Sequence, residues 1–451
     1  MRWSRYNYWF RSEKHGLLLY NSLSDEIIPL RDARLDPLFV KGAPDIDRLC
    51  DLPLWYFRFR SMHAIVKDGE ERSLLEVVRL KRRLRQCQNH GLLLTVAPTL
   101  ACDFSCSYCY VSRQADSSMD DATEDALIRF IDKWPGSREI LSIDWFGGEP
   151  LLAFDRIQSV TRKLLDGGHP LTASISTNGY HLDQSVIGAL GALRIASVHI
   201  PLDGDKCSHN ASRGLQPGKA PKPKKAGTQD EETYDRIIQN IQALLASDWK
   251  GTCTIRVNLD KSNLRDYPAL YQDLRERIPQ KNLHIYPGIL DASHRPSCSR
   301  QTPDDTEVAA LILEMYRGHG SNPRRYFAPT DPSHYCSFTQ PNSLVVAPSG
   351  KLYKCWCDLG KAALSVGNIF DQGKMTLGEA STMARYMVGV DPFDDPICAD
   401  CVLLPNCFGG CPNSRVRAKY HGHDVSYCPF MKADLPGFLE VYYENKKSQR
   451  L

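Results

Sequence analysis

Three cysteines stand within eight consecutive positions of TLACDFSCSYCYVS, the segment at residues 99–112. They are Cys102, Cys106 and Cys109, and no fourth cysteine is close to them in the sequence. Three thiolates can hold three irons of a [4Fe–4S] cluster and leave the fourth iron open to a small molecule, whereas a structural zinc ion takes four protein ligands. The spacing therefore favours an iron–sulfur cluster with one open coordination position.

A second group of eight cysteines lies between positions 336 and 428, among turn-rich segments such as PNCFGGCPNS. The chain has sixteen cysteines in all. MRWSRYNYWF, at the start, lacks the apolar core of a secretory signal, so we expect a cytoplasmic protein. In that compartment, tight cysteine spacings indicate metal binding or catalysis rather than disulfides.

Length and charge narrow the class of protein further. A chain of 451 residues is too long for one ordinary core, so two or three domains are expected. No run approaches the roughly 20 apolar residues that span a bilayer. The formal net charge of +3 gives no indication of a nucleic-acid or membrane partner.

The elements that must position the first three cysteines alternate regularly from residue 91. Six apolar segments predict strands, and polar–apolar periodicity between them predicts helices. Continuous apolar strands of this kind indicate a parallel sheet covered by helices, so we expect an α/β fold with a partial (β/α)6 barrel. The predicted strands are 92–98, 141–146, 172–177, 196–203, 253–260 and 283–290.

The rest of the chain divides around this barrel. Residues 1–90 predict a small α+β module, with two strands in 17–30 and a helix at 73–88. Residues 91–300 would form the barrel, interrupted by a Pro-, Gly- and Lys-rich insertion at 215–232. A connecting region at 301–335, a cysteine-rich domain at 336–430 and a tail at 431–451 would follow.

CDFSCSYC, followed by an aromatic residue, resembles the signature of the radical S-adenosylmethionine (SAM) enzymes. FGGEP, STNG and LDGDKCSHNASR follow after the next three strands and resemble the companion motifs of that family. The resemblance implies a [4Fe–4S] cluster on Cys102, Cys106 and Cys109 that binds SAM. The residues that it implies as SAM contacts are Tyr108, Gly147, Gly148, Glu149, Pro150, Ser176, Asn178, Asp203 and Arg213.

The second group of cysteines resembles the SPASM extension, which carries auxiliary [4Fe–4S] clusters behind a radical SAM barrel. By that resemblance Cys398, Cys401, Cys407 and Cys428 would hold one cluster, and Cys336, Cys355 and Cys411 part of another. For the fourth ligand of the latter, Cys298, Cys357 and an open iron remain as choices. The alternative is a non-enzymatic scaffold with two zinc sites, because CxxC pairs suit zinc equally well.

The resemblance implies a reaction and its partners. The enzyme would cleave SAM reductively to a 5′-deoxyadenosyl radical and oxidatively modify a ribosomally made precursor peptide, through a thioether or carbon–carbon cross-link. An external one-electron donor such as flavodoxin or ferredoxin would supply the electron. The first ninety residues resemble a winged-helix-like leader-binding module, which would bind the peptide's leader as an added strand.

Sulfatase-maturating enzymes of the same superfamily are the alternative within this class. They place an Asp base directly after the second SPASM cysteine, where this chain has Trp356. Asp358 is a candidate base, since a carboxylate near a cluster could accept a proton. Its other interpretation is an ordinary turn residue before Gly360.

Overall fold

The computed structural model describes the chain apart from residues 36–37, 40–44, 50, 88–90, 112–116, 217–232, 292–293, 295–299, 321–335, 372, 408 and 449–451. Cys298 and nearly all of the expected insertion at 215–232 therefore lie outside the described residues. The chain forms two compact units. The first comprises Met1–Gln88, Asp305–Cys336 and Met387–Leu451, and the second comprises Asn89–Asp304 and Ser337–Tyr386. Segments that the sequence separates into linear domains thus fold together.

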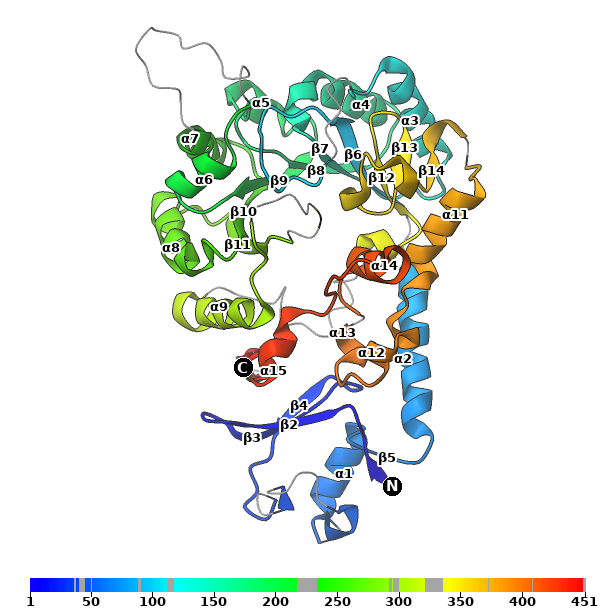
Figure 1. Cartoon of the computed structure of the whole chain (residues 1–451), viewed down its shortest axis with the longest axis vertical. Helices are drawn as coiled ribbons and strands as arrows, with labels where there is room; N and C mark the ends of the chain where they lie inside the picture. The colour runs from blue at the N-terminus through cyan, green and yellow to red at the C-terminus, as the bar shows by residue number, and fades with distance from the viewer. Residues whose placement is uncertain are drawn as a thin grey trace. The chain divides into compact units, whose positions relative to one another are not determined.

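Six parallel strands form the body of the second unit, in the spatial order β11-β10-β9-β8-β7-β6 (Figure 1). Helices connect consecutive strands, and the predicted partial (β/α)6 barrel is confirmed. The strands are β6 (Leu92–Thr99), β7 (Leu141–Gly147), β8 (Leu171–Ser176), β9 (Ile195–Leu202), β10 (Thr252–Leu259) and β11 (Leu283–Ile289). The connecting helices are α3 (Asp121–Lys133), α4 (Phe154–Asp166), α5 (Gln184–Ala189), α6 (Lys206–Ser212), α7 (Thr233–Ala246) and α8 (Tyr267–Arg277).

Aspartates fix where three of these helices begin. The side chain of Asp120 accepts a hydrogen bond from Thr123 N (2.8 Å) at the start of α3. Asp183 and Asp205 cap α5 and α6 in the same way. Each cap satisfies a backbone donor that the first helical turn leaves without a partner, which contributes about 1 kcal/mol.

Strands β7 to β9 alternate between buried and partly exposed residues, although the sequence predicts continuous apolar strands. In β7 the side chains of Ile143 and Trp145 are fully buried, and Asp144 between them points to the other face of the sheet. Ser174 Oγ on β8 donates a hydrogen bond to Asp144 there (2.9 Å). The alternation arises because helices cover one face of the sheet (Figure 1), while the opposite face carries polar side chains such as Asp144 and Ser174.

Three short strands extend the sheet beyond β6. Strand β12 (Ser343–Val346) pairs parallel with β6, and β13 (Lys351–Tyr353) and β14 (Gly367–Asn368) follow as antiparallel neighbours. The segment that carries Cys355 therefore belongs to the same sheet as the barrel. Helix α11 (Leu377–Ala384) lies in this part of the chain and begins with a capping box between Thr376 and Glu379.

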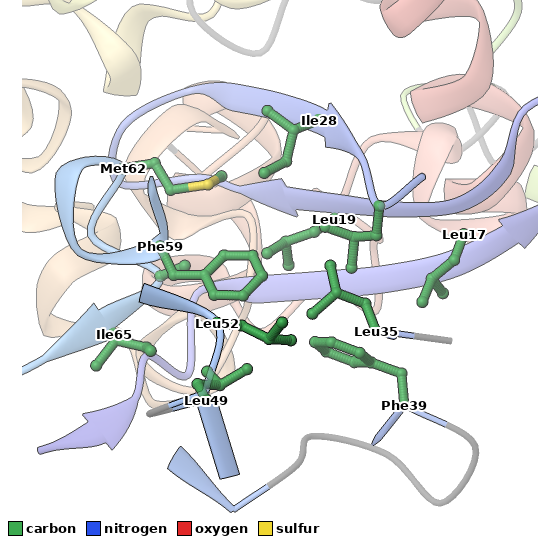
Figure 2. Close-up of a cluster of buried hydrophobic side chains, with 12 residues drawn as sticks. Leu17, Leu19, Ile28, Leu35, Phe39, Leu49, Leu52, Phe59, Met62 and Ile65 are labelled. Carbon is green, nitrogen blue, oxygen red and sulfur yellow. The ribbon is translucent and has the colours of Figure 1, made fainter. Parts of the chain in front are cut away.

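The first unit contains a three-stranded antiparallel sheet in the order β2-β3-β4. One face of this sheet and helix α1 cover an apolar cluster, and Figure 2 shows the side chains of Leu17, Leu19 and Phe59 within it. The strands are β1 (Arg2–Trp3), β2 (Asn7–Ser12), β3 (Gly16–Asn21), β4 (Glu26–Pro29) and β5 (Ile65–Val66), of which β5 pairs with β1. The helices are α1 (Pro53–Ser61) and α2 (Glu70–Cys87).

The opposite face of the same sheet is also apolar and packs against the end of the chain. Leu18 and Tyr20 on this face belong to one buried cluster with Leu403, Leu435 and Leu439. The predicted N-terminal α+β module thus has one core within residues 17–65, and β2–β4 share a second core with residues more than 370 positions later. β3 carries apolar residues on both faces, so each face of the sheet must be covered by other parts of the chain.

The remaining helices of the first unit come from its second and third segments. They are α9 (Asp305–His319), α12 (Pro396–Ala399), α13 (Leu404–Cys407), α14 (Pro412–His421) and α15 (Leu435–Ser448). Among the described residues, no helix is both long and apolar enough to cross a membrane.

Candidate active site and cluster-binding residues

The first three cysteines lie on the loop that leaves the C-terminal end of β6. Cys106 is buried, and Cys102 and Cys109 are half-buried. None of the described cysteines forms a disulfide. Burial, and after it the negative charge of Glu149, raises the pKa of the Cys102 thiol to about 12. A thiolate at this position therefore requires a bound cation, and iron is one that deprotonates a coordinating thiol outright.

Backbone hydrogen bonds hold this loop against two other parts of the barrel. Glu149 N, just beyond β7, donates to Ala101 O (2.8 Å). Ser105 N, within the cysteine segment, donates to Gly214 O (3.0 Å). The loop that carries the thiols is thus fixed at both sides by the segments that contain the companion motifs.

Gly147 and Gly148 make this close approach possible. Gly147 has φ of +123°, in the region that favours glycine. A Cβ atom on Gly148 would lie 2.6 Å from Leu100 O and even closer to Ala101 O, although real Cβ contacts are essentially never shorter than 3.0 Å. The two glycines therefore allow the end of β7 to lie directly against the cysteine loop.

Glu149 is completely buried and holds three hydrogen bonds. Its Oε1 accepts from Leu151 N (3.0 Å) and from Thr177 Oγ1 (2.7 Å), and its Oε2 accepts from Asn178 N (2.7 Å). A carboxylate offers about four acceptor positions, so one remains for a ligand. Burial raises the pKa of Glu149 to about 7 despite these hydrogen bonds, and a cationic ligand would favour the ionised form. Pro150 is buried beside it and begins a short 3₁₀ turn.

Ser176 and Asn178 lie at the C-terminal end of β8. Ser176 is half-buried and in register with His199 of β9. Asn178 is buried, and its Nδ2 donates to Asp103 Oδ1 (2.9 Å). The other oxygen of Asp103 bonds to His181 Nε2 (2.8 Å), which raises the pKa of His181. Asn178 thereby connects the strand end to the residue directly after Cys102.

Tyr108, Asp203 and Arg213 meet in one buried hydrogen-bond network. The hydroxyl of Tyr108 donates to Asp203 Oδ1 (2.7 Å) and accepts from Arg213 Nη1 (2.7 Å). Asn258 Nδ2 donates to the same Asp203 oxygen (3.0 Å). Arg213 Nε is buried and has no hydrogen-bond partner among the described residues. Arg213 therefore keeps its Nε–H as a donor for a ligand, while its Nη1 donates to Tyr108.

His209 lies beneath this network. Its ring is fully buried, and its Nδ1 accepts a hydrogen bond from Asp203 N (3.3 Å). Burial, reinforced by the charge of Arg213, lowers the pKa of His209 to about 3. The imidazole is therefore neutral near pH 7 and supports the backbone of Asp203.

Sequence reasoning did not single out several members of these networks. Asn258 and Asp260 stand at the C-terminal end of β10, where barrels carry their chemistry. Their position after a predicted strand could have identified them as candidate site residues. Asp103 follows the first cysteine of the motif. Arg300 bonds to both Asp203 Oδ2 (3.3 Å) and Asp260 Oδ2 (2.8 Å), and nothing in its local sequence indicated that role.

Four of the SPASM-like cysteines line one pocket in the first unit. They are Cys398, Cys401, Cys407 and Cys428. Cys398 lies on α12, Cys401 on the turn between α12 and α13, Cys407 at the end of α13, and Cys428 just before the 3₁₀ turn at Phe430–Asp434. Four thiols around one pocket fit the donor set of a [4Fe–4S] cluster.

No three His, Cys, Asp or Glu side chains of the described residues converge on a point that would hold a single metal ion. Cluster thiolates do not need such convergence, because each binds a different iron. The four cysteines that line the pocket are therefore compatible with an iron–sulfur cluster, although they do not form a site for a single metal ion.

The other three expected auxiliary ligands divide between the units. Cys336 and Cys411 belong to the first unit, and Cys355 belongs to the second. Cys355 and Cys357 share a side-chain hydrogen bond, which raises the pKa of Cys355 and lowers that of Cys357. The assignment of Cys336, Cys355 and Cys411 to one cluster stays a prediction.

Trp356 and Asp358 frame this second-unit cysteine pair. Trp356 stacks on Phe146 of β7, with ring centroids 5.8 Å apart and planes at 26°. Asp358 is buried and accepts a hydrogen bond from the Tyr386 hydroxyl (2.5 Å). The Trp356 ring thus packs against β7, at whose end the FGGEP motif begins, and the Tyr386 hydroxyl holds the Asp358 carboxylate in place.

These observations define a barrel protein with three thiols at the C-terminal end of its first strand. The model of the radical SAM superfamily matches residues 96–274. A serine-type anaerobic sulfatase-maturating enzyme from Klebsiella aerogenes is 31% identical over 347 residues, which cover 72% of this chain and 79% of that protein. The chain belongs to the radical SAM superfamily. Membership confirms the predicted iron–sulfur and SAM cofactors.

Two solved structures share the fold. Native anSMEcpe with bound AdoMet and the Cp18Cys peptide has a TM-score of 0.56 at 17% identity, covering 79% of this chain and 97% of that chain. Streptococcus suis SuiB bound to the precursor peptide SuiA has a TM-score of 0.51 at 16% identity. The SuiB match covers 91% of this chain and 95% of that chain. At these identities the likeness shows the fold alone.

Proposed function

We propose that this enzyme oxidatively modifies a ribosomally made precursor peptide, by a thioether or carbon–carbon cross-link. The observation that carries the proposal is the presence of two separate cysteine sites in one chain. Three thiols stand at the barrel's first strand, and four more line a pocket in the first unit. A reaction that removes a hydrogen atom and then a second electron from its substrate needs an acceptor for that electron, and an auxiliary cluster provides one.

The chain's own residues bind and orient the cofactors in this proposal. When bound, the cluster and SAM supply a hydrogen-abstracting radical. Cys102, Cys106 and Cys109 would hold the cluster. The remaining acceptor position of Glu149 suits an ammonium group, and the unpartnered Nε of Arg213 suits a carboxylate. Both groups belong to the amino-acid part of SAM.

The remaining assigned residues would complete this binding site. Gly147, Gly148 and Pro150 would shape the backbone next to the amino group, and Ser176 and Asn178 would face the ribose and carboxylate side. Tyr108 and Asp203 would orient Arg213 through the hydroxyl that links them. A ferredoxin or flavodoxin would deliver the electron that starts each turnover.

The three-stranded sheet of the first unit offers a free edge for the leader of the peptide. Tyr6 O accepts from Ser22 N (3.0 Å), and Leu30 N donates to Leu17 O (2.9 Å). Because antiparallel pairs alternate, these bonds leave the backbone groups of Trp9 directed outward from β2.

The other edge of this sheet, at β4, is less suitable. The same alternation turns Ile27 and Pro29 outward there, and Pro29 has no N–H to donate. Among the described residues no strand pairs with the outer edge of β2. The leader would therefore add to β2 as a further strand, held by backbone hydrogen bonds.

A proline substitution tests the leader site without disturbing the shared core. Trp9→Pro removes one outward N–H of β2, and Trp9→Ala removes the same side chain but keeps that N–H. The probe is a labelled precursor peptide from a short open reading frame, to be sought beside this gene, and the measurement is fluorescence anisotropy. We expect Trp9→Pro to weaken binding at least fivefold relative to Trp9→Ala, because the two variants differ only in the outward N–H and the proline ring. Equal affinity of the two variants would refute strand addition at β2.

The reaction itself is tested by mass spectrometry of the co-expressed peptide. A loss of two hydrogens that disappears in the Cys102→Ala, Cys106→Ala, Cys109→Ala variant supports an oxidative cross-link. An unmodified peptide after anaerobic turnover, with 5′-deoxyadenosine still produced, would contradict this substrate class.

Sulfatase maturation is the second candidate, because the Klebsiella aerogenes relative bears that name at 31% identity. Trp356 speaks against it, because by the family resemblance those enzymes carry an Asp base directly after the second SPASM cysteine. Trp356 stands at that place here and stacks on Phe146. Incubation of the holoenzyme with a serine-containing sulfatase peptide decides between them. Conversion of that serine to formylglycine, without any leader sequence, would favour the sulfatase candidate.

A further inference from the structure

Two cationic side chains contact the four-cysteine pocket of the first unit. Arg415 lies on α14, and its Nη1 donates a hydrogen bond to Cys398 Sγ at 3.4 Å. Lys432 lies in the 3₁₀ turn at Phe430–Asp434, and its Nζ donates to Cys428 Sγ at 3.8 Å. Lys432 also lines the pocket together with all four cysteines. Thiols on two different chain segments thus each receive an N–H from a cation.

Arg415 is held in one orientation by several neighbours. Its side chain is buried, and its Nη2 forms an ion pair with Asp395 Oδ2 (2.8 Å). Its Nε donates to Val390 O (3.1 Å), and its guanidinium lies 4.6 Å from the centre of the Tyr427 ring. Tyr427 in turn donates to Asp395 (3.1 Å). The fork of Arg415 is therefore fixed with one N–H directed at the thiol.

The two cations act on the pocket by different physical routes. Asp395 compensates the charge of Arg415, so Arg415 acts chiefly through its hydrogen bond to sulfur. Lys432 is exposed, and water and salt screen part of its charge. Its ammonium nevertheless stands at a pocket that four thiolates and a cluster would make strongly negative. Both contacts stabilise negative charge on the sulfurs.

We propose that Arg415 and Lys432 raise the reduction potential of the cluster bound by Cys398, Cys401, Cys407 and Cys428. The inference rests on the proposed cluster at this pocket. Reduction adds an electron to the cluster, and hydrogen bonds to its sulfurs together with nearby positive charge favour the reduced form. Arg415 and Lys432 are positioning residues in this role, because they act through the cysteine ligands.

The potential is measured directly by a redox titration monitored by electron paramagnetic resonance. The protein is the full chain, anaerobically reconstituted, in the background Cys102→Ala, Cys106→Ala, Cys109→Ala, so that the signals come from auxiliary clusters. The variants are Lys432→Gln, Lys432→Arg, Arg415→Gln and Arg415→Lys. Lys419→Gln is the matched control, because Lys419 lies on the same helix as Arg415 and donates to Gly389 O (2.8 Å).

We expect Lys432→Gln to lower the equilibrium constant for reduction of one cluster about threefold to tenfold. A tenfold change corresponds to about 59 mV for one electron. Arg415→Gln should lower this equilibrium constant at least as much. In Lys432→Arg and Lys419→Gln the equilibrium constant should remain within twofold of the background protein. Arg415→Lys should recover part of the loss, since it keeps a charged donor.

Iron and sulfide counts separate this inference from the cluster assignment itself. If Lys432→Gln and Arg415→Gln retain iron and sulfide and titrate within twofold of the background, the inference is overturned. If Arg415→Gln loses iron, the potential of Lys432→Gln still tests the inference, because Lys432 is exposed and its replacement leaves the buried site intact. If Cys398→Ala with Cys428→Ala leaves the iron and sulfide counts unchanged, the pocket binds no cluster and the proposed assignment fails instead.

Discussion

Replacing Gly148 with alanine would separate the cysteine loop from the strand end that supports it. The added Cβ would meet Ala101 O and lie 2.6 Å from Leu100 O, and both atoms belong to the backbone. A flexible side chain could rotate away from such a contact, but backbone atoms can move only with the loop itself. Because that loop carries Cys102, the substitution strains the same segment that would bind iron.

The magnitude follows from the cost of overpacking. Added methyl groups in well-packed sites cost typically about 1–3 kcal/mol. For a unit of this size, that corresponds to a fall in melting temperature of roughly 2–12 °C. If the loop moves to relieve the contact, Cys102 leaves its place and the site loses about four irons per chain, the content of one [4Fe–4S] cluster.

Gly188→Ala is the matched control, because Gly188 lies on α5 and a Cβ there meets nothing within 4 Å. Alanine in an exposed helix is favoured over glycine by roughly 0.5–1 kcal/mol, so this variant should melt slightly higher than wild type. Thermal melting and iron analysis of reconstituted protein provide both readouts. A Gly148→Ala protein with wild-type melting temperature and full iron content would refute the reasoning.

Three further substitutions test the buried networks. Tyr108→Phe removes a hydroxyl that joins three polar partners and should destabilise the protein by about 1–3 kcal/mol in thermal melting; a change below 0.5 kcal/mol would mean that the network does not depend on it. The folded-state pKa of His209, about 3, lies below the value of about 6.5 expected when unfolded, so its neutral ring contributes stability above pH 6.5 that is lost as the pH falls toward 3. The stability difference between wild type and His209→Gln should therefore shrink by about 2 kcal/mol from pH 8 to pH 5 in urea unfolding, and a constant difference would contradict the assigned neutral ring. Asp391→Asn removes the buried charge that pairs with Arg79 (3.0 Å) and Arg83 (2.6 Å), and should cost about 2–4 kcal/mol by thermal melting. An unchanged melting temperature would show that these ion pairs do not stabilise the first unit.

The barrel strands were predictable because each is six to eight residues long and strongly apolar on at least one face. Strands β12 to β14 were not, because they contain four, three and two residues, and such lengths carry almost no periodic signal. Their pairing depends on β6, which provides the edge that they extend.

The same distinction applies to the candidate site. Motif residues such as Asn178 and Asp203 stand at fixed positions after strands, so the topology alone brings them to one end of the barrel. Arg300 reaches Asp203 from 97 positions later, through a contact that no local pattern encodes. The polar face of β7 to β9 was missed for a related reason, since the number of layers packed on a sheet is a property of the whole chain.

The shared core of the first unit sets the order in which the protein can mature on the ribosome. Ser22 Oγ bonds to Val402 O, 380 residues later, and the sheet beside it is covered by α15 near the end of the chain. At about 5–20 residues per second, roughly 20–80 s of synthesis separate the first strands from their covering helix. During that interval one apolar face of β2–β4 is uncovered, so this part of the chain can complete its fold only after the C-terminal helix has been made.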